Sequence, residues 1–198
     1  MEEYIYKTTL AVLIIAFFII RAPSVRKASK SEKTEDKSPI RERCMVFLNF
    51  IGMMGIPFVY ILTPWLDLFT FPLPELIRIG GIAFNILGLG LLIWIHRALG
   101  EHWSMMLKLG EEHKLVTTGP YARIRHPMYT FFYILVISTA LISANLFVGI
   151  FGIGAWTLLY VVRIGDEEEM LIEEFGEEYQ AYTKRTGRLL PKYNRQTD

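Results

Sequence analysis

Long runs of apolar residues constrain this chain more than any other feature of its sequence. The longest extends from Tyr129 to Val162, well beyond the roughly 20 apolar residues that one helix needs to cross a bilayer. Ser143, Ala144 and Asn145 interrupt this run near its middle. It therefore predicts two short membrane-spanning helices joined by a tight turn.

Three further apolar runs lie in the first half of the chain, at Tyr4–Ile20, Cys44–Leu66 and Leu76–Ile95. Hydrophobic residues make up 52% of the sequence, more than the surface of a soluble domain allows. We expect one all-α, polytopic membrane domain over residues 1–198 with about five transmembrane helices, two of them forming a helical hairpin. Residues 1–95 supply three spans, and residues 96–198 carry the chemistry.

The basic residues predict the orientation of these spans. The Ala22–Arg43 loop and its edges are rich in lysine and arginine, whereas the Asp67–Glu75 connection has none. Basic loops stay on the cytoplasmic side, so we expect the N-terminus outside and the C-terminus in the cytoplasm. The membrane is then the plasma membrane in a prokaryote or the endoplasmic reticulum in a eukaryote.

The balance of charge and the scarcity of metal-ligand patterns exclude other classes of function. Lysine and arginine number 21 against 20 aspartate and glutamate, which argues against a nucleic-acid partner. The four histidines (His96, His102, His113, His126) lack the paired spacing of a zinc site, so we expect no metal. The single cysteine, Cys44, cannot form an internal disulfide.

Two polar segments beside the hairpin carry the candidate chemistry. Thr118-Gly119-Pro120-Tyr121 is a turn signal, and it would expose backbone groups able to bind an adenine edge. Arg163 and Glu167 are four residues apart and so share one face of the helix leaving the membrane. This pair could hold a substrate carboxylate and a positively charged cofactor group. Alternatively, Arg163 extends to the headgroups and pairs with Glu167, and His126 is a simple hydrogen-bonding residue at the interface.

The order of these motifs resembles that of a known family. Leu-Val-Thr-Thr-Gly-Pro-Tyr is followed by Arg-His-Pro-x-Tyr, an apolar hairpin, Arg-x-x-x-Glu and Phe-Gly-Glu-Glu-Tyr-x-x-Tyr. This ordered set resembles the isoprenylcysteine carboxyl methyltransferases, whose wider relatives are the membrane phospholipid methyltransferases. The resemblance covers about residues 96–191.

The resemblance implies an S-adenosylmethionine-dependent transfer of a methyl group to the C-terminal carboxylate of a prenylated cysteine, or to a similar lipid-linked acid. It places the cofactor in a pocket on the cytoplasmic face and assigns Glu167 to the cofactor's ammonium group and Arg163 to the substrate carboxylate. Backbone contacts to the adenosine fall on His113, Lys114, Leu115 and Val116. The remaining cofactor contacts fall on Met106, Tyr121, His126, Pro127, Met128 and Tyr129.

One departure from the family bears on the substrate. Many relatives have glycine two positions after the motif tyrosine, where this chain has Phe131, which changes the expected width of the adjoining tunnel. The competing functions are a phospholipid amine N-methyltransferase, a sterol reductase using NADPH and a non-catalytic membrane scaffold.

Overall fold

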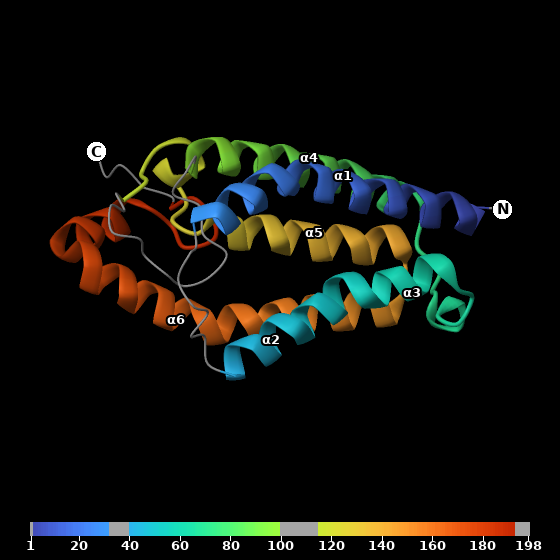
Figure 1. Cartoon of the computed structure of the whole chain (residues 1–198). Helices are drawn as coiled ribbons and strands as arrows, with labels where there is room; N and C mark the ends of the chain where they lie inside the picture. Colours follow the sequence, from blue (N-terminus) through green and yellow to red (C-terminus); the bar gives the residue numbers. More distant parts are fainter. Residues whose placement is uncertain (1, 32–39, 100–114, 193–198) are drawn as a thin grey trace.

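The computed structural model describes residues 2–31, 40–99 and 115–192. Over these residues the chain is a bundle of helices without strands, as the apolar runs predict (Figure 1). The long helices are α1 (Glu2–Ser31), α4 (Glu75–Leu99), α5 (Pro127–Ser143) and α6 (Leu146–Arg185). The other elements are α2 (Ile40–Phe50), the π-helical turn η1 (Ile51–Gly55), α3 (Ile56–Leu62), and the 3-10 turns η2 (Asp67–Phe69) and η4 (Gly119–Ala122).

The described residues contain five apolar passes. By length and composition, four helical segments could each cross a membrane: α1, the continuous run through α2, η1 and α3, α4, and α6. The fifth pass, α5, is apolar but has only 17 residues. The prediction of an all-α polytopic membrane protein is confirmed.

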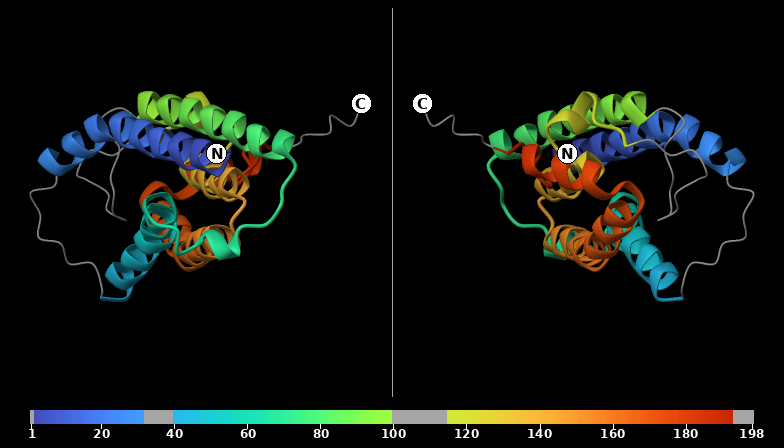
Figure 2. Two further views of the ribbon diagram at one scale, coloured as in Figure 1. Left: turned by 90° about the vertical axis from the view of Figure 1, so that its right-hand side faces the viewer. Right: turned by 90° about the vertical axis from the view of Figure 1, so that its left-hand side faces the viewer.

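Helix α5 lies at the centre of the bundle. Helices α1 and α4 lie on one side of it, and α6 with the α2–α3 segment lies on the other (Figures 1 and 2). The turn between α5 and α6 is at the same end of the bundle as the start of α1, and we call this the hairpin end. The opposite end, where η4 and the last turns of α6 lie, is the site end.

The predicted hairpin turn is confirmed, and it has a defined chemistry. Ala144 adopts a positive φ of 46°, and Asn145 then begins α6 by accepting hydrogen bonds from the N–H groups of Phe147 and Val148 at 3.1 and 3.2 Å. The Asn145 amide also donates to the carbonyl of Leu66 at 2.6 Å. The polar break in the apolar run is therefore both a helix cap and a link to the second span.

The prediction that a basic loop begins at Ala22 is wrong. Helix α1 continues to Ser31 with Pro23 inside it, and the next helix begins at Ile40. The lysines, arginines and serines of this stretch disfavour burial in lipid, but they do not prevent the helix from continuing after it leaves the bilayer.

A network of ions and hydrogen bonds, the hairpin-end network, joins four segments of the chain. It consists of Glu3, Lys7, Tyr60, Asp67 and Arg78. The Arg78 side chain pairs with Glu3 at 2.9 Å and donates to the Ile142 carbonyl at 2.9 Å. The Tyr60 hydroxyl bonds Glu3 and the Ser143 carbonyl, and Lys7 pairs with Asp67 at 2.6 Å. These contacts fix α1 and α4 to the hairpin turn.

Candidate active site at the end of the bundle

The site end is built from three segments distant in sequence: the residues before α5, the part of α6 beyond the apolar run, and the segment after α6. Helix α6 bends at Gly176, whose φ of 51° and ψ of −124° are not helical. Beyond the bend the Tyr182 hydroxyl donates to the carbonyl of Tyr121 at 2.7 Å. The bend therefore brings the end of α6 back onto η4 (Figure 1).

His126 lies between two carboxylates of α6. Its Nδ1 is 3.3 Å from Glu167 Oε1, and its Nε2 is 3.3 Å from Glu168 Oε1. Burial, which leaves 4% of His126 exposed, would lower the pKa of this imidazole, but the hydrogen bonds to Glu167 and Glu168 raise the pKa of His126 above its ordinary value. The imidazolium, which donates from both nitrogens, suits this position.

Glu167 is oriented from two sides but retains capacity for a ligand. The Tyr129 hydroxyl donates to its Oε2 at 2.7 Å, while His126 approaches its Oε1. A carboxylate accepts about four hydrogen bonds, so further donors can be accommodated. Arg163, one helical turn earlier on α6, is near enough for its charge to act on this carboxylate.

Aromatic rings continue from this carboxylate along α5 and α6. The Tyr129 ring centroid is 5.5 Å from that of Trp156 and 5.2 Å from that of Tyr160. Tyr133 contacts the same two rings at 6.1 and 5.8 Å. These side chains from α5 and α6 form an apolar wall that faces cations favourably, because the face of an aromatic ring is electron-rich.

The predicted Thr118–Tyr121 turn is confirmed as η4. Gly119 has a φ of +61°, and an added Cβ would lie 3.0 Å from the Cβ of Ala98 at the end of α4. Glycine is therefore needed both for the backbone conformation and for the contact. Burial and the nearby charge of Glu167 raise the pKa of Tyr121 well above its ordinary value, so Tyr121 lies near the same carboxylate.

Glu168 and its two arginine partners were missed by the sequence reasoning. Glu168 Oε1 pairs with Arg125 Nε at 2.9 Å and with Arg188 Nε at 3.1 Å. The backbone supports these pairs, because Arg125 N–H donates to the Gly187 carbonyl at 2.9 Å and His126 N–H to the Arg188 carbonyl at 3.1 Å. We call the segment 186–189 the strap.

The structure brings together five of the residues singled out from the sequence: Tyr121, His126, Tyr129, Arg163 and Glu167. The other described residues that the sequence predicts to contact the cofactor lie on the segment before η4 and at the start of α5. Pro127 is buried at the start of α5, Met128 packs against the core, and Leu115 and Val116 are half-buried on the segment before η4. Met106, His113 and Lys114 lie outside the described residues.

Phe131, the departure from the family pattern, faces away from this site. Its ring stacks on that of Phe17 with centroids 5.9 Å apart, and it reaches the surface of α4 at Gly88. Within the described ranges, no group of three or more potential metal-ligating side chains has a geometry able to hold a metal ion.

Comparison with known proteins agrees with this arrangement. Residues 81–173 match the model of the isoprenylcysteine carboxyl methyltransferase family. A protein-S-isoprenylcysteine O-methyltransferase of Schizosaccharomyces pombe is 36% identical over 96 residues, which are 46% of this chain and 40% of that protein. The nickel-cobalt-cadmium resistance protein NccN of Alcaligenes xylosoxydans xylosoxydans is 27% identical over 112 residues, 56% of this chain and 52% of that one.

The fold also matches a solved structure. The eukaryotic intramembrane Ras methyltransferase, an isoprenylcysteine carboxyl methyltransferase, superposes with a TM-score of 0.54 at 25% identity, covering 89% of this chain and 60% of that chain. The present chain therefore spans less than two thirds of the length of these relatives.

The fold and site define a polytopic, all-α membrane protein with a charged and aromatic site at one end of its bundle. Over residues 81–173, which contain His126, Tyr129 and Glu167 of this site, the chain resembles the isoprenylcysteine carboxyl methyltransferase family. The resemblance drawn from the order of its motifs is confirmed.

Proposed function

We propose that this protein transfers a methyl group from S-adenosylmethionine to the carboxylate of a prenylated cysteine or of a similar lipid-linked acid. The observation that carries the proposal is the position of Glu167. This half-buried carboxylate is held by His126 and Tyr129, lies one helical turn from Arg163 and adjoins an aromatic wall. The family match over residues 81–173 supports methyl transfer as the reaction at this site.

The residues of the site fit the cofactor. S-adenosylmethionine, when bound, supplies the methyl group from a sulfonium and carries an ammonium group close by. Glu167 has remaining acceptor capacity for that ammonium, and the rings of Tyr129 and Tyr160 can face a cation. The backbone of Leu115 and Val116, on the segment just before η4, would contact the adenosine.

Arg163 has the matching role for the second substrate. A carboxylate is already ionised at neutral pH, so methyl transfer to it needs no general base. The requirement is to align the two reactants and keep water from the anion. Arg163 would orient the carboxylate, and the aromatic wall would exclude water. The lipid tail would then extend into the bilayer beside α5 and α6.

The site end faces the cytoplasm in this proposal. The basic residues between the first two spans support this orientation, and a soluble cofactor would reach the site from that side. The partners are then the membrane, the cofactor and a lipid-linked small molecule or prenylated protein.

Transfer of radiolabelled methyl from S-adenosylmethionine to a farnesylated cysteine analogue tests the proposal, with phosphatidylethanolamine as a parallel acceptor. Base-labile label on the farnesyl compound is expected. Label on the phospholipid alone would assign the chain to the N-methyltransferases instead. Absence of label on either acceptor, together with no thermal shift by S-adenosylhomocysteine, would support a non-catalytic scaffold.

Two variants make this assay specific to the site. Arg163→Ala should lower turnover or raise the KM for the farnesyl compound while preserving the affinity for S-adenosylhomocysteine. Glu173→Gln removes a charge from an exposed position of α6 and serves as the matched control. If Arg163→Ala has the same KM and turnover as the control, the role given to Arg163 is wrong.

A further inference from the structure

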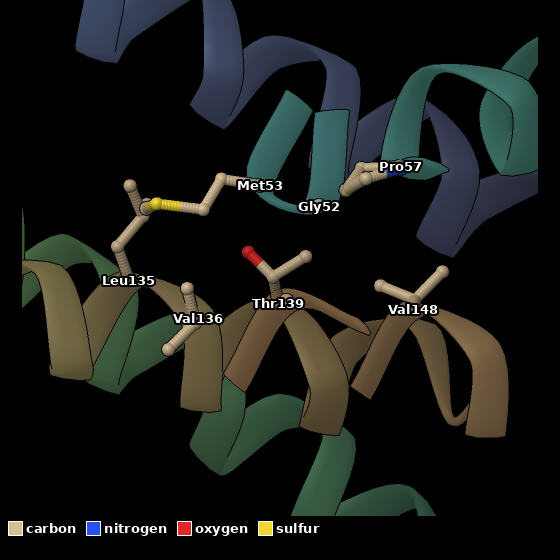
Figure 3. A pocket seen from close by; sticks show the side chains of 8 residues that line it. Gly52, Met53, Pro57, Leu135, Val136, Thr139 and Val148 are labelled. Carbon is tan, nitrogen blue, oxygen red and sulfur yellow. The ribbon is translucent and has the colours of Figure 1, made fainter. Parts of the chain in front are cut away.

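A small pocket lies between α5, α6 and the second span, away from the site. It has room for about one water molecule and is lined by Gly52, Met53, Pro57, Leu135, Val136, Thr139, Val148 and Gly152. Figure 3 shows the side chains that converge on it from both sides. Most of its lining is apolar, but two polar groups face it, one from the backbone and one from a side chain.

The backbone group arises from the π-helical turn η1. In this turn the N–H of Ile56 bonds the carbonyl of Ile51, five residues earlier. The next residue is Pro57, which has no N–H. One carbonyl of this turn therefore lacks the N–H donor that another residue at position 57 would supply. It is the carbonyl of Gly52 if the helix continues with π-helical hydrogen bonds, or the carbonyl of Met53 if it continues with α-helical ones. Both residues line the pocket.

The helices cannot close over this carbonyl group by approaching each other further. An added Cβ on Gly52 would lie 2.6 Å from the Cβ of Ala155 and 2.7 Å from the carbonyl oxygen of Phe151 on α6. A Cβ on Gly152 would lie 3.6 Å from the oxygen of Gly52. The two backbones are already in contact, and the pocket beside them offers space for a donor at this point.

The side-chain group is the hydroxyl of Thr139 on α5. Thr139 is 7% exposed, and its hydroxyl points across the pocket toward the helical segment that carries Gly52 and Met53 (Figure 3). Among the described residues this hydroxyl makes no hydrogen bond. A hydroxyl that opens onto a small pocket without a protein partner can bond a molecule held in that pocket.

We propose that this pocket binds one water molecule, which donates to the free carbonyl of η1 and exchanges a hydrogen bond with the Thr139 hydroxyl. Buried waters satisfy such pairs of polar groups, and they require both polar partners and a space of their own size. Ordered water is one of the means by which backbone groups freed by proline or glycine in membrane helices find hydrogen-bond partners. The water joins the second span to α5 within the membrane.

The sign of one substitution distinguishes a hydrated pocket from a dry one. Thr139→Val keeps the side-chain shape but removes the hydroxyl. If water is bound, this variant loses a hydrogen bond, and its midpoint temperature of unfolding should fall by about 2–4 °C. If the pocket is dry, the variant loses an unsatisfied polar group and should be as stable as the parent or more stable, which would overturn the proposal.

A second substitution tests the link to η1. Pro57→Ala restores the missing N–H, so the carbonyl no longer needs water. The effect of Thr139→Val should therefore shrink in the Pro57→Ala background, and an unchanged effect would contradict the link. Thr8→Val is the control, because the exposed Thr8 hydroxyl bonds the Tyr4 carbonyl of its own helix.

The water can also be detected in the parent protein without any substitution. X-ray radiolysis turns a bound water into a hydroxyl radical that oxidises adjacent side chains, and mass spectrometry locates the product. Met53 lines the pocket and is 7% exposed, so its oxidation in the folded protein is expected. No oxidation of Met53 under conditions that oxidise the exposed Cys44 would overturn the proposal.

Discussion

Both ends of the bundle contain networks of ion pairs, but the two networks are built in different ways. The hairpin-end network joins side chains of regular helices to helix-terminal carbonyls, as when Arg78 bonds Glu3 and the carbonyl of Ile142. The network at the site end rests on irregular backbone, since His126 and Arg125 are held by the strap. Its carboxylate Glu167 keeps acceptor capacity, whereas Arg78 is surrounded by partners.

This difference separates stability from function. Changes at the hairpin end should lower the free energy of unfolding and leave ligand affinity unchanged. Changes at the site end should alter ligand affinity more than stability. Each of the following predictions tests this separation.

The largest effect is expected from Arg78→Met. Arg78 is 8% exposed, and loss of one partner of a buried ion pair costs about 3–5 kcal/mol. Glu3 is partly exposed, which favours the lower end of that range. Thermal and chemical unfolding in detergent measure the loss, and Arg26→Met, at an exposed position of α1, is the control. An unchanged midpoint, or a loss of S-adenosylhomocysteine affinity in the folded variant, would contradict the separation of roles.

Glu167→Gln should have the opposite profile. The variant retains an acceptor for Tyr129 but loses the charge that, in the proposed function, would meet the cofactor's ammonium. A hydrogen bond to a charged group contributes about 1.5–3 kcal/mol, so the Kd for S-adenosylhomocysteine should rise about tenfold to hundredfold. Isothermal titration calorimetry measures this change beside Glu173→Gln. Equal Kd values for the two variants would remove Glu167 from the cofactor site.

The pH dependence of stability should originate at the site end. The pKa of His126 is raised in the folded protein by Glu167 and Glu168, with Arg125 and Arg188 on the far side of Glu168. A group whose pKa is higher in the folded than in the unfolded protein stabilises the fold when it is protonated. This stabilisation is fully present below the pKa of the unfolded state, about 6.5, and is lost as the pH rises through the pKa of the folded state.

Unfolding midpoints between pH 6 and pH 9 measure this contribution, which should be smaller than the effect of either preceding substitution. His126→Gln should remove the decline, and Arg78→Met should leave its slope unchanged. A slope that survives in His126→Gln would place the titrating group elsewhere.

The smallest effect is expected from Lys7→Met. Lys7 is 14% exposed and also donates to the Thr63 carbonyl, but its partner Asp67 is 44% exposed, and an ion pair that water reaches contributes only about 0–1 kcal/mol. The variant should unfold within a degree or two of the parent and bind S-adenosylhomocysteine equally well. A loss as large as that of Arg78→Met would show that Lys7 is an essential member of the hairpin-end network.

Much of the fold follows from local sequence, because the membrane imposes a length on each apolar run. The hairpin turn was predictable for the same reason, since Asn145 is a good helix cap. The end of α1 was not, because a helix that leaves the membrane as far as Ser31 gives no hydropathy signal. The site was predictable in part through its motifs.

Glu168 was missed because its importance depends on distant backbone pairing. In the sequence it is one of four consecutive acidic residues, Asp166–Glu169, and such a run at the start of a polar helix is usually solvated. Only the pairing of Arg125 and His126 with the strap brings Arg188 and Arg125 onto one carboxylate. No local pattern contains information about two segments more than 60 residues apart.

The strap has a consequence for biogenesis. It follows all five apolar passes in the order of synthesis, so a ribosome-bound chain can insert every helix before the strap is free to pair with residues 123–126. During translation the nascent protein therefore holds its membrane topology without a finished site. A stop codon or a protease cut between Gly176 and Thr186 would leave an inserted protein without a finished site, which would still compete for membrane insertion.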